Sequence, residues 1–183
     1  SKTIVELESH TNEILKIVEL IVKSQETNNK VLVAGNGGSC ADAEHFTGEL
    51  NCTFSDKGRR AIAAECLSKN SAAVTAWSND FGFDTFFKRQ VEANGKSGDI
   101  LILLSTGGGN KEENTSMNLV YAAEEAKKNG IKVVSLIGKT GGILKEISDL
   151  KIIVKSNVTA LIQEAHMSIL HCICMCLEGA FKK

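Results

Sequence analysis

The stretch VLVAGNGGSCADAEHFTGEL, residues 31–50, decides the fold of this chain. Its first five residues form an apolar run that ends in the glycine-rich turn GNGGS. A polar helical pattern follows and carries His45 and Glu49 four residues apart. A short, wholly apolar strand that turns directly into a helix is typical of a parallel sheet covered on both faces. The stretch therefore predicts an α/β fold, and it places a candidate binding loop next to a candidate ligand pair.

The remaining sequence repeats this alternation. Apolar strands are expected at 61–66, 100–105, 131–137 and 150–155. Helices are expected at 2–28, 40–50, 71–78, 83–93, 115–130, 143–148 and 160–181. We predict one domain over residues 1–183, a three-layer α/β/α sandwich around a parallel sheet. The N-terminal segment 1–29 and the C-terminal helix are more apolar than a monomer surface needs, which fits packing between subunits and burial within the chain equally well.

Composition limits the classes of partner. The 183 residues carry a formal net charge of −1, so neither a nucleic acid nor a membrane surface is expected as a partner. The apolar run that leads into Ser105 is far too short to span a bilayer. The first ten residues, SKTIVELESH, lack the apolar core of a signal peptide. We therefore expect a cytoplasmic protein.

Six cysteines raise the question of disulfides or a metal site. Three of them, Cys172, Cys174 and Cys176, alternate within the predicted C-terminal helix, where positions i and i+2 lie on different faces. This spacing disfavours a shared metal ion. We expect reduced thiols that are buried as small apolar groups.

Two predicted strands lead into glycine-rich loops, AGNGGS and LSTGGG. Glycines let backbone N–H groups approach an anion, and the following helix N-terminus favours negative charge. Hydroxyl donors are available at Ser39, Ser105, Thr106 and Ser116. A single such loop often does no more than end a strand, but two at successive strand ends favour a phosphorylated ligand. Neither loop has the spacing of a dinucleotide-binding or P-loop motif.

His45 and Glu49 share one helix face and can bind one zinc ion, although a solvated His–Glu pair fits the same spacing. The stretch LIQEAHMSILH adds Gln163, His166 and His171. On one straight helix Gln163 and His171 differ by ~12 Å in rise. They can share a small site only if the helix starts after Gln163 or if neighbouring subunits supply different members.

Together, GNGGSCADAEHFTGEL, SNDFG, ILILLSTGGG and LIQEAHMSILH resemble the sugar isomerase (SIS) fold, which is flavodoxin-like, and specifically the bacterial phosphoheptose isomerases. The resemblance extends over about residues 30–178. It implies a homotetramer with active sites between subunits. It also implies interconversion of sedoheptulose 7-phosphate and a D-glycero-manno-heptose 7-phosphate, a phosphorylated seven-carbon sugar, for lipopolysaccharide or capsule.

The resemblance also assigns residues. It implies one zinc ion per active site, held by His45, Glu49, Gln163 and His171. Glu49 is implied as the base and His171 as the acid of an enediol mechanism. The implied substrate contacts are Asn36, Gly37, Gly38, Ser39, Glu49, Asn79, Asp80, Ser105, Thr106, Gly107, Ser116 and Gln163.

One segment departs from the family pattern. The usual loop STSGNS reads STGGGNKEENTSMN here, so Gly107 stands at a phosphate-binding serine and about six residues, GGNKEE, are inserted. Either Ser116 or Asn110 takes the last serine position. Lys111 can help to neutralise a phosphate or be a solvated loop charge. Two alternatives therefore stay open, an isomerase of another phosphosugar and a non-catalytic sugar-phosphate-binding regulator. The complete His/Glu/Gln/His set favours the enzyme over the regulator.

Overall fold

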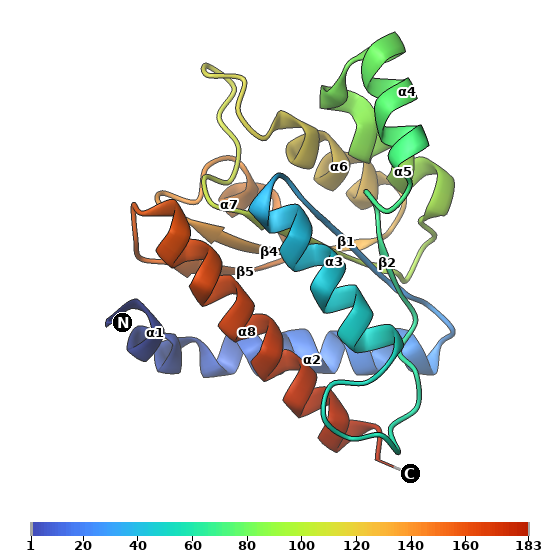
Figure 1. The fold of residues 1–183 in the computed structure, drawn as a ribbon, viewed down its shortest axis with the longest axis vertical. Coiled ribbons are helices and arrows are strands. Elements are labelled where there is room, and N and C mark those ends of the chain that lie inside the picture. Colours follow the sequence, from blue (N-terminus) through green and yellow to red (C-terminus); the bar gives the residue numbers. More distant parts are fainter. Residues whose placement is uncertain (1, 183) are drawn as a thin grey trace.

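The computed structural model describes residues 2–182, and Figure 1 shows a parallel sheet between layers of helices. The elements are α1 (Lys2–Val5), η1 (Glu6–His10), α2 (Thr11–Glu26), β1 (Val31–Gly35), α3 (Gly38–Asn51), β2 (Ala64–Cys66), α4 (Ser71–Phe81), η2 (Phe83–Thr85), α5 (Phe86–Asn94), β3 (Ile100–Ser105), α6 (Met117–Lys128), β4 (Lys132–Gly138), α7 (Leu144–Ile147), β5 (Leu150–Val154) and α8 (Thr159–Ala180).

The five strands are all parallel and lie in the order β2-β1-β3-β4-β5. This is the doubly wound, flavodoxin-like order, in which ligands bind beyond the carboxyl ends of the strands. The predicted three-layer α/β/α architecture is confirmed. Gly35 of β1 pairs with Leu104 of β3, so the two glycine-rich loops leave the sheet at the same edge.

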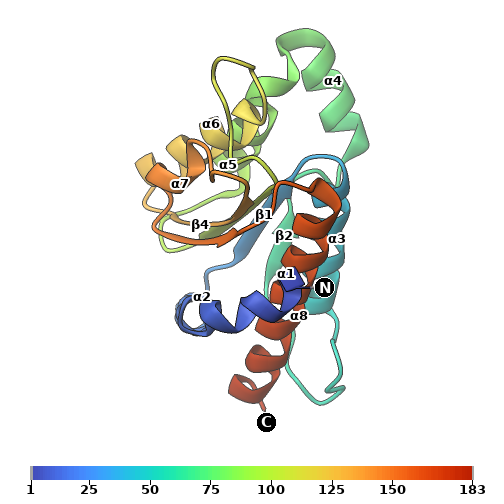
Figure 2. The ribbon, with the colours of Figure 1, turned by 90° about the vertical axis from the view of Figure 1, so that its left-hand side faces the viewer.

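Side-chain alternation along the strands produces two cores. Val33, Ile102 and Leu136 point to one face and pack with α2, α3 and α8. Leu32, Leu101 and Val133 point to the other face and pack with α5, α6 and α7. Figure 2 shows the two helical layers on either side of the sheet. Helix α4 projects beyond the sheet, and it has no buried residue.

The predicted single helix over residues 2–28 is interrupted. The 3-10 turn η1 separates α1 from α2. The Ser9 hydroxyl donates to the Glu6 carbonyl and the Thr11 hydroxyl to that of Glu8, and such local bonds compete with a regular helix. Strand β2 is also shorter than the predicted 61–66, because only residues 64–66 pair with β1.

Helix α8 is long and apolar enough, by length and composition alone, to cross a membrane. It nevertheless contributes Ile162, Ile169, Ile173 and Leu177 to the core. The expectation that all of its cysteines are buried is wrong. Cys174 is buried, but Cys172 and Cys176 are exposed, because residues two apart on a helix point in different directions.

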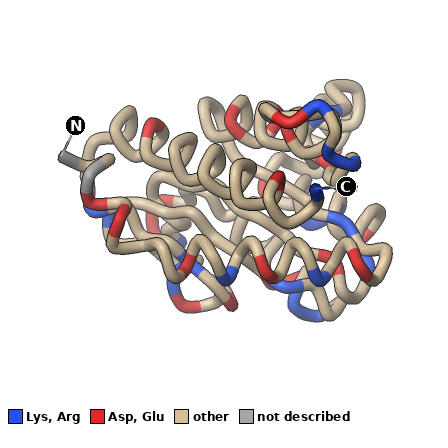
Figure 3. Tube along the Cα trace, turned by 90° about the horizontal axis from the view of Figure 1, so that it is seen from below, with Lys and Arg blue, Asp and Glu red and all other residues tan. Residues whose placement is uncertain are grey.

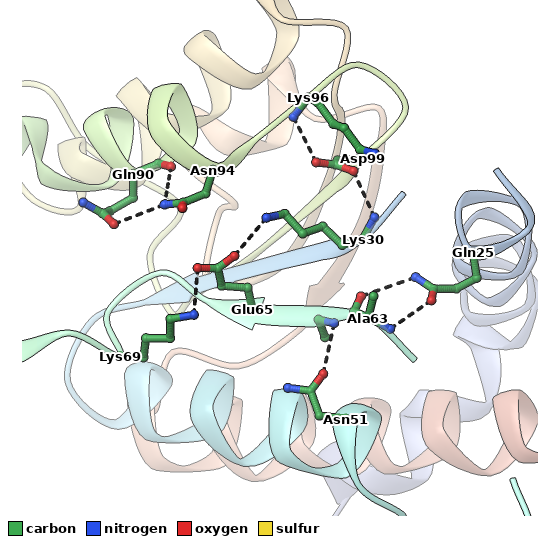
Figure 4. A network of polar contacts seen from close by, with 11 residues as sticks. Gln25, Lys30, Asn51, Ala63, Glu65, Lys69, Gln90, Asn94, Lys96 and Asp99 are labelled. Carbon is green, nitrogen blue, oxygen red and sulfur yellow. Dashed lines mark hydrogen bonds and ion pairs between the residues drawn. The ribbon is translucent and has the colours of Figure 1, made fainter. Parts of the chain in front are cut away.

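A polar network joins β1, β2 and β3 near their amino ends (Figure 4). The Asp99 carboxylate accepts from the backbone N–H groups of Lys30 and Lys96 at 2.9 Å each. Glu65 pairs with Lys30 and Lys69, both at 2.9 Å, and the pKa of its carboxyl is lowered, because bonds to these two lysines outweigh the effect of burial. This network fixes the edge opposite the glycine-rich loops. Elsewhere acidic and basic residues are interspersed along the chain (Figure 3).

Candidate active site

The first glycine-rich loop, residues 35–39, joins β1 to α3. Gly37 has a φ of +55°, a left-handed conformation that suits glycine. A Cβ at Gly35 would lie 2.5 Å from the carbonyl oxygen of Ser39, so this tight turn excludes a side chain there. The predicted contacts Asn36, Gly37, Gly38 and Ser39 therefore lie at the carboxyl edge of the sheet, where the first turn of α3 begins.

The second loop, residues 105–116, leaves β3 beside the first. The buried Ser105 hydroxyl accepts from the N–H of Gly108 at 2.9 Å and so shapes the turn. Residues 110–115 form a small, largely exposed hairpin, closed by an antiparallel bridge between Asn110 and Thr115. The Asn114 amide reaches Asp84 at 3.3 Å. The hairpin thus extends outward from the loop, while Ser105 stays buried at its start.

A pair of amides joins the two loops. Asn36 donates to Asn118 at 2.9 Å and Asn118 donates back at 2.8 Å. Asn118 lies in the first turn of α6, two residues after Ser116, and it is buried. Sequence reasoning missed Asn118. The sequence feature that could have identified it is its place in TSMN, the segment that resembles the end of the family's phosphate loop.

A hollow of about 320 Å³ adjoins the first loop. Its lining is Gly35, Asn36, Gly37, Cys40, Ser68, Ser71, Val74, Thr75, Phe83 and Phe87. Helix α4 forms one wall with its N-terminal half. The predicted contacts Asn79 and Asp80 lie at the exposed C-terminal end of α4, where Asn79 donates to Asp80 at 2.8 Å. Larger hollows lie elsewhere, including one of about 730 Å³ lined partly by Gln25, Lys30 and Lys96 at the opposite edge of the sheet.

Helices α3 and α8 lie side by side and bring three predicted site residues together (Figures 1 and 2). His45 Nε2 lies 3.3 Å from Glu49 Oε1 and 3.2 Å from His171 Nε2. The His45 side chain is 47% exposed and that of Glu49 is 23% exposed, so solvent and substrate can reach the cluster. Phe54 packs against the His171 ring, with the centroids 5.3 Å apart.

The spacing of these donor atoms fits a metal ion. Two imidazole nitrogens at 3.2 Å repel unless a proton or a cation lies between them. In a tetrahedral zinc site with bonds of about 2.0–2.1 Å, neighbouring donors are about 3.3 Å apart. Within residues 2–182, no group of three or more His, Cys, Asp or Glu side chains is arranged to hold a metal ion. The chain thus supplies donors of the right kind and pairwise spacing.

Gln163 lies elsewhere on α8. Its amide is beside Gly38, where a Cβ would overlap the Gln163 Nε2 atom. Since Gly38 opens α3, Gln163 is level with the first loop and about two helical turns from His171. The structure therefore groups Gln163 with the loop contacts and the other three predicted ligands with one another.

Two further titratable groups lie on these helices. Burial raises the pKa of the Asp42 carboxyl, and the nearby His45 opposes this effect. His166 is fully buried, and burial lowers its pKa to about 4, with a smaller opposing effect from the backbone of Ile137. His166 is therefore a neutral core residue at physiological pH.

The similarity to known proteins extends over nearly the whole chain. The SIS domain family matches residues 2–138. The phosphoheptose isomerase of Helicobacter pylori (strain P12) is 41% identical over 175 residues, which cover 96% of this chain and 88% of that protein. The structure of the phosphoheptose isomerase GmhA from Neisseria gonorrhoeae has a TM-score of 0.88 at 32% identity, covering 97% of this chain and 92% of that one. The corresponding structure from Francisella tularensis has a TM-score of 0.89 at 34% identity, with the same coverage.

The resemblance predicted from the sequence motifs is thus confirmed. The sheet is parallel, as expected, and both glycine-rich loops leave it at one edge. The chain belongs to the phosphoheptose isomerase family of SIS-domain proteins.

Proposed function

We propose that this protein is an aldose–ketose isomerase that interconverts sedoheptulose 7-phosphate and D-glycero-D-manno-heptose 7-phosphate. The observation that carries the proposal is the cluster of His45, Glu49 and His171, on helices that begin beside the glycine-rich loops. This arrangement supports an acid–base pair on the two helices that lead away from a proposed anion-binding edge. Family membership supports the same reaction.

The phosphate is proposed to bind at the second loop and the sugar hydroxyls at the first. Ser105, Thr106, Gly107 and Ser116 line the proposed phosphate site, and Asn36, Gly37, Gly38 and Ser39 the sugar site. Ser116 is the better candidate for the last loop position, because the side-chain carbonyl of Asn110 already accepts from the N–H groups of Glu112 and Glu113. Asn79 and Asp80 are proposed to contact substrate from α4.

The isomerisation moves a proton between C1 and C2 of the sugar through an enediol. Glu49 is proposed as the base that removes the proton from one carbon and returns it to the other. His171 is proposed as the acid that protonates the carbonyl oxygen and then takes the proton from the hydroxyl on the neighbouring carbon, so that the new carbonyl forms and His171 regains its proton.

We propose one zinc ion per active site, held by His45, Glu49, Gln163 and His171. A bound divalent cation would polarise the sugar oxygens and stabilise negative charge as it develops. We also propose a homotetramer with sites between subunits. The separation of Gln163 from His171 along α8 supports this arrangement. Gln163 of one subunit and His171 of another can then belong to the same site, so that each α8 helix contributes to two sites.

Two finer points belong to the proposal. A cytoplasmic location and a role in lipopolysaccharide or capsule synthesis fit a soluble enzyme of this class. The inserted hairpin favours a second candidate function, isomerisation of another phosphosugar, because it changes the rim of the phosphate loop.

The test is turnover of sedoheptulose 7-phosphate by the full chain, with product identification by NMR and with and without a chelator. Formation of an aldoheptose 7-phosphate supports the proposal. Turnover confined to a different phosphosugar would support the second candidate, and binding without turnover would support a regulatory protein.

A further inference from the structure

The loop of residues 52–60, between α3 and β2, contacts both helices that carry the proposed catalytic residues. Three side chains make the attachments: Phe54 packs on His171, Arg59 binds the end of α3, and Glu178 of α8 holds the middle of the loop. Nothing in the proposed reaction uses these three side chains. Their contacts with the site therefore need another explanation.

Arg59 fixes the last turn of α3. Its side chain is buried, and the residue is 7% exposed. Nη2 donates to the Glu49 carbonyl at 2.7 Å, and Nη1 donates to the carbonyls of Leu50 and Arg60 at 3.1 and 2.6 Å. Carbonyls in the last turn of a helix lack helical partners, and that end carries partial negative charge. The rigid guanidinium fork supplies hydrogen-bond donors to these carbonyls and a positive charge next to the negative helix end, at the residue that bears the proposed base.

Glu178 fixes the loop against α8. Its Oε1 accepts from the N–H groups of Ser55 and Asp56, both at 2.7 Å, and its Oε2 accepts from the Ser55 hydroxyl. Burial acts to raise the pKa of this carboxyl, but these hydrogen bonds lower it to about 2, so the anion is held firmly. Glu178 lies seven residues after His171, about two turns along the same helix face. The loop thus connects the two positions, because Phe54 next to Ser55 touches the His171 ring.

We infer that Arg59 and Glu178 are positioning residues of the isomerase, acting through the 52–60 loop to hold Glu49 and His171 at their spacing from His45. This inference rests on the proposed function of that cluster. Arg59 sets the backbone at Glu49, and Glu178 sets the loop that supports His171. Displacement of a catalytic group by about 1 Å can reduce a rate about 100-fold, so small movements here are sufficient to matter.

The test compares Glu178→Gln and Arg59→Lys with the matched control Arg60→Lys. A glutamine at position 178 has one acceptor oxygen in place of two, and lysine cannot bind two helix carbonyls as a fork. Arg60 is adjacent and exposed, and its guanidinium lies over Phe181, 4.3 Å from the ring centroid, rather than on α3. Ser55→Ala, which removes one hydroxyl bond only, gives a milder variant if Glu178→Gln does not fold.

Two readouts are needed, steady-state kinetics and amide hydrogen exchange by mass spectrometry. We expect kcat to fall about 10- to 100-fold with little change in KM, together with faster exchange confined to residues 48–60. We expect Arg60→Lys to match the wild type and Ser55→Ala to lie between. Unchanged kcat despite faster loop exchange would overturn the inference, as would loss of protection throughout the core in Ser55→Ala.

Failure of the proposed function can be distinguished from failure of this inference. If the wild type does not turn over sedoheptulose 7-phosphate, that proposal fails, and the kinetic comparison is made on the phosphosugar that the wild type does isomerise. Hydrogen exchange does not depend on the substrate. It still reports whether Glu178 and Arg59 order the last turn of α3, and a wild-type exchange rate in both variants would overturn the inference by itself.

Discussion

The amides of Asn36 and Asn118 bind each other in both directions, at 2.9 and 2.8 Å, and join the two glycine-rich loops. Asn36 follows the end of β1, and Asn118 lies in the first turn of α6. The side-chain carbonyl of Asn118 also accepts from the N–H of Leu119 at 3.0 Å. The sugar-binding and phosphate-binding loops proposed here are therefore held in one fixed relation.

The first prediction concerns this pair. Asn118→Ala leaves the part-buried Asn36 amide without its partner, a loss of about 1–3 kcal/mol. We expect a higher KM for the sugar phosphate and a lower free energy of unfolding, measured by kinetics and urea titration. Asn129→Ala, at the exposed C-terminal end of the same helix, is the control. An unchanged KM in Asn118→Ala would show that the loops keep their relation without the pair.

The second prediction contrasts two neighbouring glycines. A Cβ at Gly107 meets nothing within 4 Å, whereas a Cβ at Gly108 would overlap the Gly141 carbonyl oxygen at a φ of +74°. We expect Gly107→Ser to keep its stability within about 0.5 kcal/mol and to lower KM by adding a hydroxyl to the phosphate loop. Gly108→Ser is expected to lose at least about 2 kcal/mol. Thermal unfolding and kinetics measure both, and a higher KM in Gly107→Ser would contradict the assigned phosphate site.

The sequence was sufficient for the fold, because strands such as 31–35 and 100–105 are almost wholly apolar and bounded by glycine turns. It also predicted that His45 and Glu49 share a face, since their spacing is local. It did not reveal that Asn118 pairs with Asn36 or that Glu178 binds residues 55 and 56, because those contacts join segments 82 and more than 120 residues apart. The sequence did not predict the break at η1, because hydrogen bonds from short side chains to the backbone leave no trace in the spacing of apolar residues.

The third prediction concerns the proposed base. Glu49→Gln keeps the size of the side chain but cannot remove a proton, and general-base catalysis contributes about 10²–10⁴-fold. We expect turnover to fall by at least that range, with an unchanged unfolding temperature and oligomer size by light scattering. Activity near that of the wild type would exclude Glu49 as the base.

The fourth prediction concerns the proposed metal. Incubation with a chelator is expected to lower activity, and added zinc is expected to restore it, because His45, Glu49 and His171 present donors at metal-like spacing. Elemental analysis of active protein provides a second measurement. Full activity in protein that contains no bound metal would contradict the proposal.

The last prediction follows from His166. Its pKa is about 4 in the folded protein, against an ordinary value of 6.5, because burial disfavours the charged ring. Below pH 6.5 the unfolded chain therefore binds a proton that the folded chain does not, so stability is present above that pH and is lost as pH falls towards 4. The loss amounts to about 3 kcal/mol at about 1.4 kcal/mol per pH unit. Glu178, whose pKa is about 2, adds to the loss only below about pH 4.5.

Urea unfolding between about pH 7 and about pH 4.5 should therefore show a free energy of unfolding that falls as the pH falls, and His166→Leu should flatten this slope. An equal slope in both proteins would mean that His166 is protonated in the folded core.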